Sequence, residues 1–291
     1  MLKRALVVGG TLFIGRVLVE KLKARGYEVS ILSRSSGIRA DRNNPDEVRR
    51  ALAGLRFDVV FDNVYDWERG TTADQVAGTA EACLHEGLRR YVFMSSVAAY
   101  GEEGMQVRYE DSPLAPDDYR LVYSRDKAMS ERALFAMPGL PVCTLRPPFV
   151  YGPRNPFHRE AFFWERLGQR VLIPEHGERT MQFIHVDDLA EIAILAVEHP
   201  DAAGLAFNAA NPEAVTQVEF VDALASAAGG SFEKVFVPRE ELPAGAFGEY
   251  LDLPPIPQDT SNVQNVLQFT TRPFAEGLRQ TYEWWVAQRS T

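Results

Sequence analysis

Cysteine and histidine are scarce in this chain. Its 291 residues include two cysteines, Cys83 and Cys143, and five histidines. The cysteines lie far apart in apolar stretches, so the sequence offers no CxxC pair, no metal-binding spacing and no disulfide framework. His185 precedes Asp187 and Asp188, but a metal site would need a second ligand at metal spacing. We therefore predict no metal site and expect both cysteines to be small core residues.

Long apolar runs and a basic excess are also missing. No run approaches the roughly 18–20 apolar residues that span a bilayer. Lys3 and Arg4 lead into a short apolar run, without the apolar core and cleavage site of a signal peptide. A cytoplasmic protein without membrane contact is expected.

The 31 basic and 40 acidic side chains give a net charge of −9, which argues against a nucleic-acid partner but is compatible with a local basic patch.

The composition is that of an ordinary globular protein, with 46% hydrophobic and 24% charged residues. Its length exceeds one typical domain. The chain begins with an apolar run at residues 5–8, a loop with three glycines at residues 9–15 and a helix-like segment at residues 16–25. A buried strand that turns through glycines into a helix is typical of phosphate-binding loops. A plain strand, turn and helix with no ligand is the alternative.

Glycine in this loop permits a tight turn and a close approach of backbone to a pyrophosphate, and the helix N-terminus adds unpaired N–H groups. Leu12 stands where the commonest version of the loop has a glycine, and its side chain is expected to narrow the room beside the pyrophosphate. The predicted cofactor-binding residues of the loop are Gly9, Gly10, Thr11, Leu12, Phe13, Ile14 and Gly15.

Strand-like and helix-like segments alternate along the first half of the chain. Apolar runs at residues 27–32, 57–61, 90–94 and 141–145 are separated by helical periodicity at residues 45–55, 73–86 and 124–136. This alternation predicts an α/β fold with a Rossmann-type doubly wound parallel sheet. Ligands of such sheets bind beyond the carboxyl ends of the strands. Polar residues follow the predicted strands at Ser33, Arg34, Asp62, Asn63, Ser95 and Ser96.

Prolines become frequent after about residue 150 and divide the chain into short pieces. We predict a dinucleotide-binding domain at residues 1–151 and a smaller, loop-rich C-terminal substrate lobe at residues 152–291. The chain is expected to return to the first domain around residues 181–200. Helices are expected in the second half at residues 186–198, 217–228 and 273–287.

Tyr123 and Lys127 are four residues apart in a predicted helix, which places the phenol and the ammonium on one face. An ammonium near a phenol favours the phenolate, so a tyrosine of reference pKa near ~10 becomes able to act as a general acid or base. An exposed helix with an incidental tyrosine and lysine is the alternative, because the pattern is short.

Five motifs in order support the catalytic interpretation. Residues 9–15, 94–101, 123–127, 146–153 and 183–190 together resemble the extended short-chain dehydrogenase/reductase family, to which nucleotide-sugar epimerases and dehydratases belong. Residues 259–261 and 273–284 are similar to the closing segment of that family. The resemblance runs from residue 5 to about residue 285 and implies the family's Rossmann fold.

The resemblance also implies roles. Tyr123 would be the catalytic acid/base, Lys127 would lower its pKa and hold the nicotinamide ribose, and Ser96 would hydrogen-bond the reacting oxygen, with Ser95 as a competing candidate. Pro148 falls in the strand-end segment that the family places beside the nicotinamide. The chemistry implied is hydride transfer between a carbinol or carbonyl carbon and the nicotinamide ring.

The choice of cofactor follows from the end of the second predicted strand. Enzymes that prefer NAD usually place an acidic residue there for the ribose 2′-hydroxyl, whereas this chain has Ser33, Arg34 and Ser35. A guanidinium and hydroxyls suit a 2′-phosphate, so NADP is favoured over NAD. By the resemblance, Asp41 and Arg42 would contact the adenine, and Asn63 and Val64 would line the ribose and phosphates.

Departures from the family pattern narrow the function. Ser96 is followed by Val97 and Ala98 in place of the Asp-Glu pair of sugar dehydratases, which argues against elimination chemistry. Met181 replaces an arginine that grips a sugar-nucleotide diphosphate in the family. The sequence therefore predicts an NAD(P)-dependent reductase or epimerase that acts on a hydroxyl or keto carbon of a sugar-like or nucleotide-sugar small molecule.

Two other functions stay open. Residues 9–15, 40–43 and 57–62 resemble chloroplast stem-loop RNA-binding proteins and their bacterial relatives, so one alternative is an RNA-binding protein on a dehydrogenase scaffold. The other is an NADP-binding sensor without turnover. The family's habit suggests a homodimer formed through a helix bundle.

Overall fold

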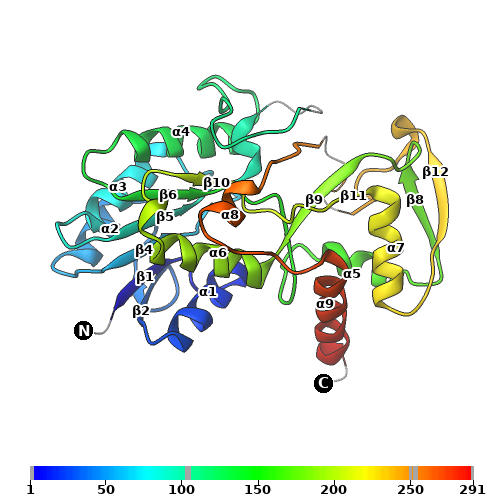
Figure 1. The fold of residues 1–291 in the computed structure, drawn as a ribbon, viewed down its shortest axis with the longest axis horizontal. Coiled ribbons are helices and arrows are strands. Elements are labelled where there is room, and N and C mark those ends of the chain that lie inside the picture. Colours follow the sequence, from blue (N-terminus) through cyan, green and yellow to red (C-terminus); the bar gives the residue numbers. More distant parts are fainter. Residues whose placement is uncertain (1–2, 102–105, 249–250, 252–254, 290–291) are drawn as a thin grey trace.

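The computed structural model describes residues 3–101, 106–248, 251 and 255–289. Its main feature is a seven-stranded sheet of order β10-β6-β5-β4-β1-β2-β3, at the left in Figure 1. All of its strand pairs are parallel. The strands are β1 (Arg4–Val8), β2 (Glu28–Ser33), β3 (Ile38–Arg39), β4 (Val59–Asp62), β5 (Arg90–Met94), β6 (Val142–Leu145) and β10 (Ala206–Phe207).

Helices cover both faces of this sheet (Figure 1). On one face α1 (Phe13–Ala24) and α6 (Val186–Glu198) pack into one apolar cluster with β1, β4 and β5. On the other face α2 (Pro45–Leu52), α3 (Ala73–Cys83) and α4 (Val122–Ala136) pack into a second. Strands covered on both faces need apolar side chains throughout, as in residues 5–8, which are fully buried. The predicted doubly wound α/β fold is confirmed, and Cys83 and Cys143 are buried.

Local sequence signals explain where the helices begin. Asn44 caps α2 by accepting a hydrogen bond from the Glu47 N–H, and Pro45 occupies its first turn, where a missing N–H costs nothing. Thr72 and Gln75 form a reciprocal capping box at α3. These caps fix the helices on the edge of the sheet where the functional residues lie.

The second lobe, at the right in Figure 1, holds two small sheets that the proline-rich sequence did not predict. One has the order β11-β9-β7, and the other pairs β12 with β8. The core of this lobe is aromatic, with Phe183 stacked on both Phe220 and Phe274. Its elements are β7 (Phe149–Tyr151), α5 (Arg159–Trp164), β8 (Arg170–Pro174), β9 (Thr180–His185), β11 (Ala214–Thr216), α7 (Gln217–Ala227), β12 (Glu233–Val237) and α9 (Phe274–Arg289).

The chain passes from one lobe to the other more than once. After β9 it enters α6, which lies on the main sheet beside α1, and then β10, which pairs with β6. Short helical segments complete the chain: η1 (Val97–Tyr100), η2 (Pro200–Ala202), η3 (Arg239–Glu241) and α8 (Ser261–Asn265). In the described part of the chain, no helix is long and apolar enough to cross a membrane.

His185 caps the N-terminus of α6 from a buried position. Its Nδ1 accepts a hydrogen bond from the Asp187 N–H at 3.2 Å, and its ring lies 5.2 Å from the ring of Tyr151. Burial, with the positive charges of Arg272 and Lys21, lowers the pKa of His185 from 6.5 to about 3. The imidazole is therefore neutral in the folded protein at neutral pH.

We expect this neutral histidine to make the fold sensitive to acid. Between pH 6.5 and about 3 the unfolded chain binds a proton at His185 that the folded chain does not. The contribution of His185 to stability is therefore fully present above pH 6.5 and is lost as the pH falls toward 3, by at most about 1.4 kcal/mol per pH unit. Urea unfolding across this range measures the slope, which His185→Asn should reduce. The exposed His176 provides the control, because His176→Asn should keep the wild-type slope. Equal slopes for wild type and His185→Asn would contradict the prediction.

Candidate active site

The glycine loop between β1 and α1 has no room for side chains at two positions. A Cβ on Gly15 would lie 2.0 Å from the carbonyl oxygen of Gly9, and a Cβ on Gly9 would lie 2.3 Å from Cγ2 of Val64. Gly9 also has a φ of +83°, which favours glycine. The loop is therefore wound tightly against the end of β4 and leaves backbone at its surface.

Leu12 does not narrow this loop as the sequence suggested. Its side chain is 73% exposed and points to solvent from the residue that precedes α1. Together with Thr11, Phe13, Arg16 and Arg154 it lines a cavity of about 330 Å³ at the start of the helix. The backbone at the helix N-terminus thus remains approachable for a phosphate group.

Tyr123, Lys127 and Ser96 come together at the carboxyl end of β5. Tyr123 and Lys127 lie one turn apart on α4, with the Lys127 ammonium 5.8 Å from the centre of the Tyr123 ring. The ammonium donates a hydrogen bond of 2.7 Å to the carbonyl oxygen of Met94, the last residue of β5. Ser96 lies close enough to the phenol of Tyr123 to lower the pKa of that phenol. The three residues that the sequence singled out thus form one cluster.

Ser95 faces away from this cluster. Its hydroxyl donates a hydrogen bond to the carboxylate of Glu131, which is fully buried and paired with Arg146 at 2.6 Å. Arg146 also donates to the hydroxyl of Tyr100 at 2.8 Å. Of the two serines, the structure places Ser96 beside the phenol and Ser95 in a buried polar network.

Gln258 connects this network to the C-terminal part of the chain. Its side-chain amide donates to the carbonyl oxygen of Arg146 and to Oδ1 of Asn208, each at 2.9 Å. Its backbone N–H donates to Oε1 of Gln182 at 2.7 Å. The segment around Gln258 is therefore anchored to the residue that follows β6, although the two residues are 112 positions apart in the chain.

Burial controls the protonation of the catalytic pair. It raises the pKa of the Tyr123 phenol, while the hydrogen bond from Ser96 and the positive charge of Arg159 act in the opposite direction. Burial likewise lowers the pKa of the Lys127 ammonium to about 8. At neutral pH the phenol is therefore protonated, which is the state of a general acid.

Aromatic side chains that the sequence analysis missed surround Tyr123. Trp67, in the loop after β4, stacks on its ring with centroids 4.8 Å apart. Tyr65 packs edge-on at 4.7 Å and donates a 3.0 Å hydrogen bond to Asp126. Two aromatic residues soon after a strand end were the signal that could have found them. They shield the phenol from water.

Arg159, at the start of α5, is a second residue that the sequence analysis missed. It is 8% exposed, and its guanidinium lies 4.7 Å from the ring centre of Phe157 and 5.3 Å from that of Phe149. Phe157 packs edge-on against Trp67. The second lobe thus places a buried cation near the phenol of Tyr123.

The residues predicted to hold the adenosine lie at the ends of β2, β3 and β4. Ser33 accepts hydrogen bonds from the N–H groups of Ser35 and Ser36, which turns the chain after β2. Arg34 is exposed from this turn and, with Arg39, Ala40, Asp41 and Glu47, lines a cavity of about 190 Å³. This cavity thus lies at the carboxyl ends of the strands, where a nucleotide is expected to bind.

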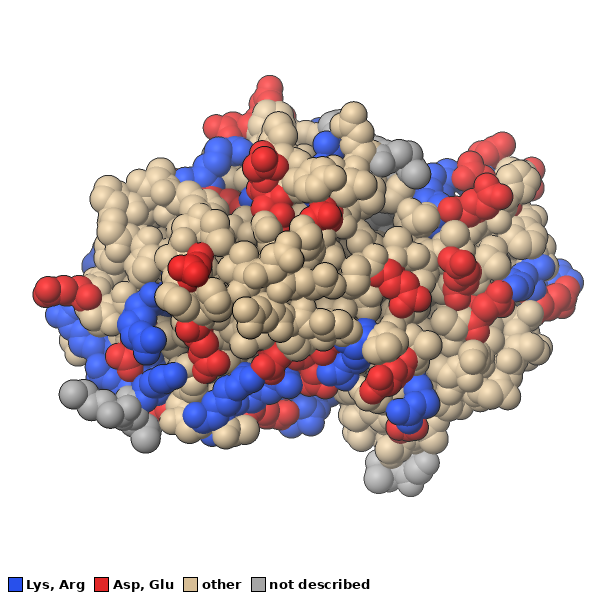
Figure 2. Space-filling model, viewed as in Figure 1, with Lys and Arg blue, Asp and Glu red and all other residues tan. Residues whose placement is uncertain are grey.

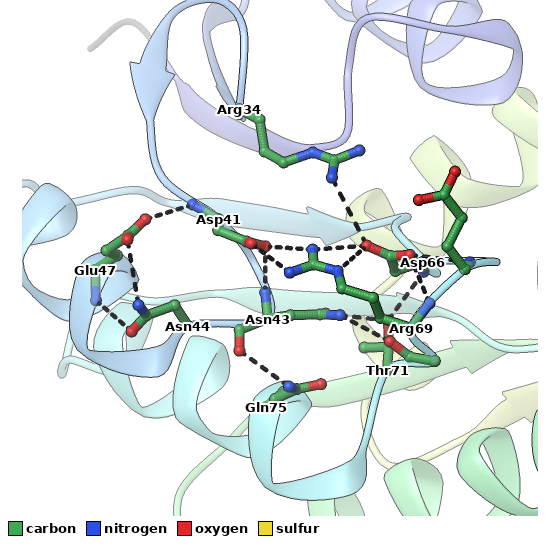
Figure 3. A network of polar contacts seen from close by, with 11 residues as sticks. Arg34, Asp41, Asn43, Asn44, Glu47, Asp66, Arg69, Thr71 and Gln75 are labelled. Carbon is green, nitrogen blue, oxygen red and sulfur yellow. Dashed lines mark hydrogen bonds and ion pairs between the residues drawn. The ribbon is translucent and has the colours of Figure 1, made fainter.

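Arg42 does not fit its predicted role. Its guanidinium is buried against Asp62, with further bonds to the Gln75 carbonyl and to Thr79. Because the Arg42 side chain is 4% exposed and lies between these partners, it has no open face for an adenine ring, and the predicted contact of Arg42 with the adenine is corrected. Besides Arg34, a guanidinium that reaches the surface at this edge is that of Arg69, which bonds both Asp41 and Asp66 (Figure 3).

Other predicted cofactor residues are placed at the same edge without a distinguishing contact. Asn63 and Val64 follow β4 directly, and Pro148 lies between β6 and β7. Among the described residues, no group of three or more His, Cys, Asp or Glu side chains could hold a metal ion. On the face shown in Figure 2, Lys and Arg side chains alternate with Asp and Glu.

The fold agrees with the comparisons. A family model described as the NAD dependent epimerase/dehydratase family matches residues 5–210. The chain therefore belongs to this family, within the extended short-chain dehydrogenase/reductase fold, and its prediction as an enzyme of this type is confirmed.

Curated relatives differ in what their names describe. The chloroplast stem-loop binding protein of 41 kDa b from Arabidopsis thaliana is 27% identical over 78% of this chain and 64% of its own length, so the match spans less than two thirds of that protein. The 3-diazoavenalumate denitrifying reductase from Streptomyces is 33% identical over 67% of this chain and 72% of its own.

Solved structures support the fold across the whole chain. UDP-glucose 4-epimerase from Thermus thermophilus, solved in complex with NAD, is 26% identical and superimposes with a TM-score of 0.79. The match covers 97% of this chain and 99% of that one.

Proposed function

We propose that this protein is an NADP-dependent oxidoreductase, a reductase or epimerase, that acts on a hydroxyl or keto carbon of a sugar-like small molecule. The observation that carries the proposal is the cluster of Ser96, Tyr123 and Lys127 at the carboxyl end of β5. The names of a reductase and an epimerase among its relatives support the same chemistry.

Ser96, Tyr123 and Lys127 each have a separate role in a carbonyl reduction. The bound nicotinamide supplies the hydride. Ser96 hydrogen-bonds the reacting oxygen, and Tyr123 gives that oxygen a proton as its charge develops. Lys127 then stabilises the phenolate that remains, because its ammonium lies on the same face of α4. In the oxidative direction Tyr123 takes the proton back.

The preference for NADP rests on Arg34. Its guanidinium is 70% exposed at the end of β2, where a 2′-phosphate attached to the adenosine ribose would lie. Arg39 lines the same cavity, which adds a second positive charge. The cavity, which Asp41 and Glu47 also line, thus offers two guanidinium groups as hydrogen-bond donors to a phosphate.

We expect Arg34→Ala to weaken the binding of NADPH by about tenfold or more and that of NADH much less, because only NADPH loses a charge-assisted hydrogen bond. Dissociation constants from calorimetry measure both. Arg49→Ala, an exposed arginine on α2 paired with Asp46, is the control and should change neither. Equal losses for the two nucleotides would contradict the assignment of the 2′-phosphate.

Turnover itself is tested with the purified protein and a panel of hydroxy and keto compounds, followed by nicotinamide absorbance. The nucleotide that copurifies separates the two enzyme types. An epimerase recycles its cofactor and retains it, whereas a reductase exchanges it in each turnover. A protein that binds NADPH but never changes nicotinamide absorbance would be a sensor, and the enzyme proposal would fail.

RNA binding is the second candidate, favoured by the name of the Arabidopsis relative. The net charge of −9 and the mixed charges in Figure 2 argue against it. A mobility-shift experiment with structured RNA at physiological salt decides between them. Submicromolar, salt-sensitive binding would favour the RNA function. A cytoplasmic location, a homodimer and the division at residue 151 stay predictions.

A further inference from the structure

Two arginines from different strand ends share one carboxylate. Arg34 follows β2, and Arg69 lies in the loop after β4. Nη1 of Arg34 lies 3.8 Å from Oδ2 of Asp66, and Nη2 of Arg69 lies 2.7 Å from the same atom. Figure 3 shows the two guanidinium groups meeting at Asp66. A single carboxylate oxygen thus holds two positive charges close together.

Arg69 also binds a second carboxylate, that of Asp41. Its two terminal nitrogens donate to both oxygens of Asp41, at 2.8 and 3.1 Å. These hydrogen bonds hold the pKa of Asp41 below its ordinary value. The loop after β4 is tied down further where the side chain of Asn43 donates to the carbonyl oxygen of Gly70 at 2.7 Å. Arg69 is therefore fixed over the edge where β2, β3 and β4 end.

We propose that Arg69 joins Arg34 in binding the 2′-phosphate of NADP(H), and that Asp66 holds the two guanidinium groups until the phosphate replaces it. The inference rests on the proposed use of NADP. A phosphate offers three acceptor oxygens and more negative charge than a carboxylate, so it can bind both guanidinium groups at once.

Replacing Asp66 by a phosphate as the partner of the two guanidinium groups costs little free energy. The arginine side chains are open to water, since Arg34 is 70% exposed and Arg69 48% exposed. The Asp66 side chain is 10% exposed, but it also accepts hydrogen bonds from the N–H groups of Glu68 and Arg69, which remain when the guanidinium groups leave. Ion pairs in such positions stabilise a fold only slightly, so releasing them costs little. The cavity lined by Arg34 and Asp41 lies beside the pair and provides space for a ribose phosphate.

The loop after β4 also carries a tryptophan, whose fluorescence can report the replacement of Asp66 by a phosphate. Trp67 is two residues before Arg69 and stacks on Tyr123. When Arg69 turns from Asp41 to a phosphate, the loop shifts and the surroundings of Trp67 change. Ligands with a 2′-phosphate should therefore alter tryptophan fluorescence in the wild type and not in Trp67→Phe.

The decisive experiment uses nucleotide fragments without the nicotinamide. Binding of adenosine 2′,5′-bisphosphate and of 5′-AMP is measured by calorimetry on the full chain. The variants are Arg69→Met, the isosteric Asp66→Asn, and Arg49→Met as the control. Arg69 lies in an exposed loop, so its replacement leaves the core intact. Circular dichroism of each variant verifies its fold.

Arg69→Met should weaken the bisphosphate by about tenfold and change 5′-AMP less than about twofold. Asp66→Asn should tighten the bisphosphate several-fold, because the competing carboxylate is gone, and leave 5′-AMP unchanged. Arg49→Met should match wild type.

Four results would overturn the inference. Equal weakening of both ligands by Arg69→Met would show that Arg69 contacts the shared part of the nucleotide. Weaker bisphosphate binding in Asp66→Asn would show that Asp66 supports the site and does not compete for it. A wild type whose preference for the bisphosphate depends on Arg34 but not on Arg69 would overturn this inference alone. A wild type that binds neither nucleotide would overturn the proposed function together with it.

Discussion

Tyr123→Phe is expected to lower turnover about 100-fold or more while nucleotide affinity changes little. Phenylalanine keeps the ring, so the stacking of Trp67 and the edge contact of Tyr65 remain. What the variant loses is the hydroxyl that, in the proposed mechanism, exchanges a proton with the reacting oxygen. Steady-state kinetics with a turned-over substrate gives kcat, and calorimetry with NADPH gives the affinity.

The two serines supply the matched controls for this prediction. Ser96→Ala should also reduce kcat, because its hydroxyl lies beside the phenol. Ser95→Ala should leave kcat nearly unchanged, because its hydroxyl points to Glu131. Undiminished turnover in Tyr123→Phe would disprove the mechanism, and a larger loss in Ser95→Ala than in Ser96→Ala would reverse the roles of the serines.

Glu131→Leu is expected to lower the free energy of unfolding by about 3–5 kcal/mol, because it leaves the buried guanidinium of Arg146 without its countercharge. Glu131 is fully buried and Arg146 is 3% exposed. The pair is joined through Nη2 at 2.6 Å and through Nε at 3.0 Å. Urea unfolding with linear extrapolation measures the loss.

A double variant separates the charge pair from ordinary packing. Arg146→Met alone should cost a similar amount, and Glu131→Leu with Arg146→Met should cost clearly less than the sum, because no lone charge is then buried. The exposed pair of Arg279 and Glu283 on α9 is the reference, where Arg279→Met should cost less than about 1 kcal/mol. Strict additivity of the two buried replacements would contradict the prediction.

Five strands of the main sheet were predictable from their apolar runs, whereas the two-residue edge strands β3 and β10 were not predicted. The strand at residues 90–94 and the helix at residues 186–198 have the predicted bounds, since apolar runs and helical periodicity mark them directly. β8 and β12 were not predicted. They are half-exposed, and each needs a partner about 60 residues away, which periodicity within one segment does not reveal.

The residues of the candidate site that belong to a sequence motif were predictable. Those that are defined by contacts between distant parts of the chain were not. Tyr123, Lys127 and Ser96 were found because their order resembles a family. Arg42 was misassigned because its partner Asp62 is contributed by the next strand. Trp67 and Arg69 were missed because their roles depend on contacts with Tyr123 and Asp41, respectively, and only folding brings these residues together.

The position of Gln258 has a consequence for how the protein is made. A ribosome releases the nucleotide-binding half of the chain first, and β1 to β6 can pair while the remainder is still being synthesised. The carbonyl oxygen of Arg146 and Oδ1 of Asn208 receive the hydrogen bonds of Gln258 only when residue 258 has emerged. A nascent chain can thus have most of its main sheet assembled before Gln258 completes this hydrogen-bond network near the end of translation.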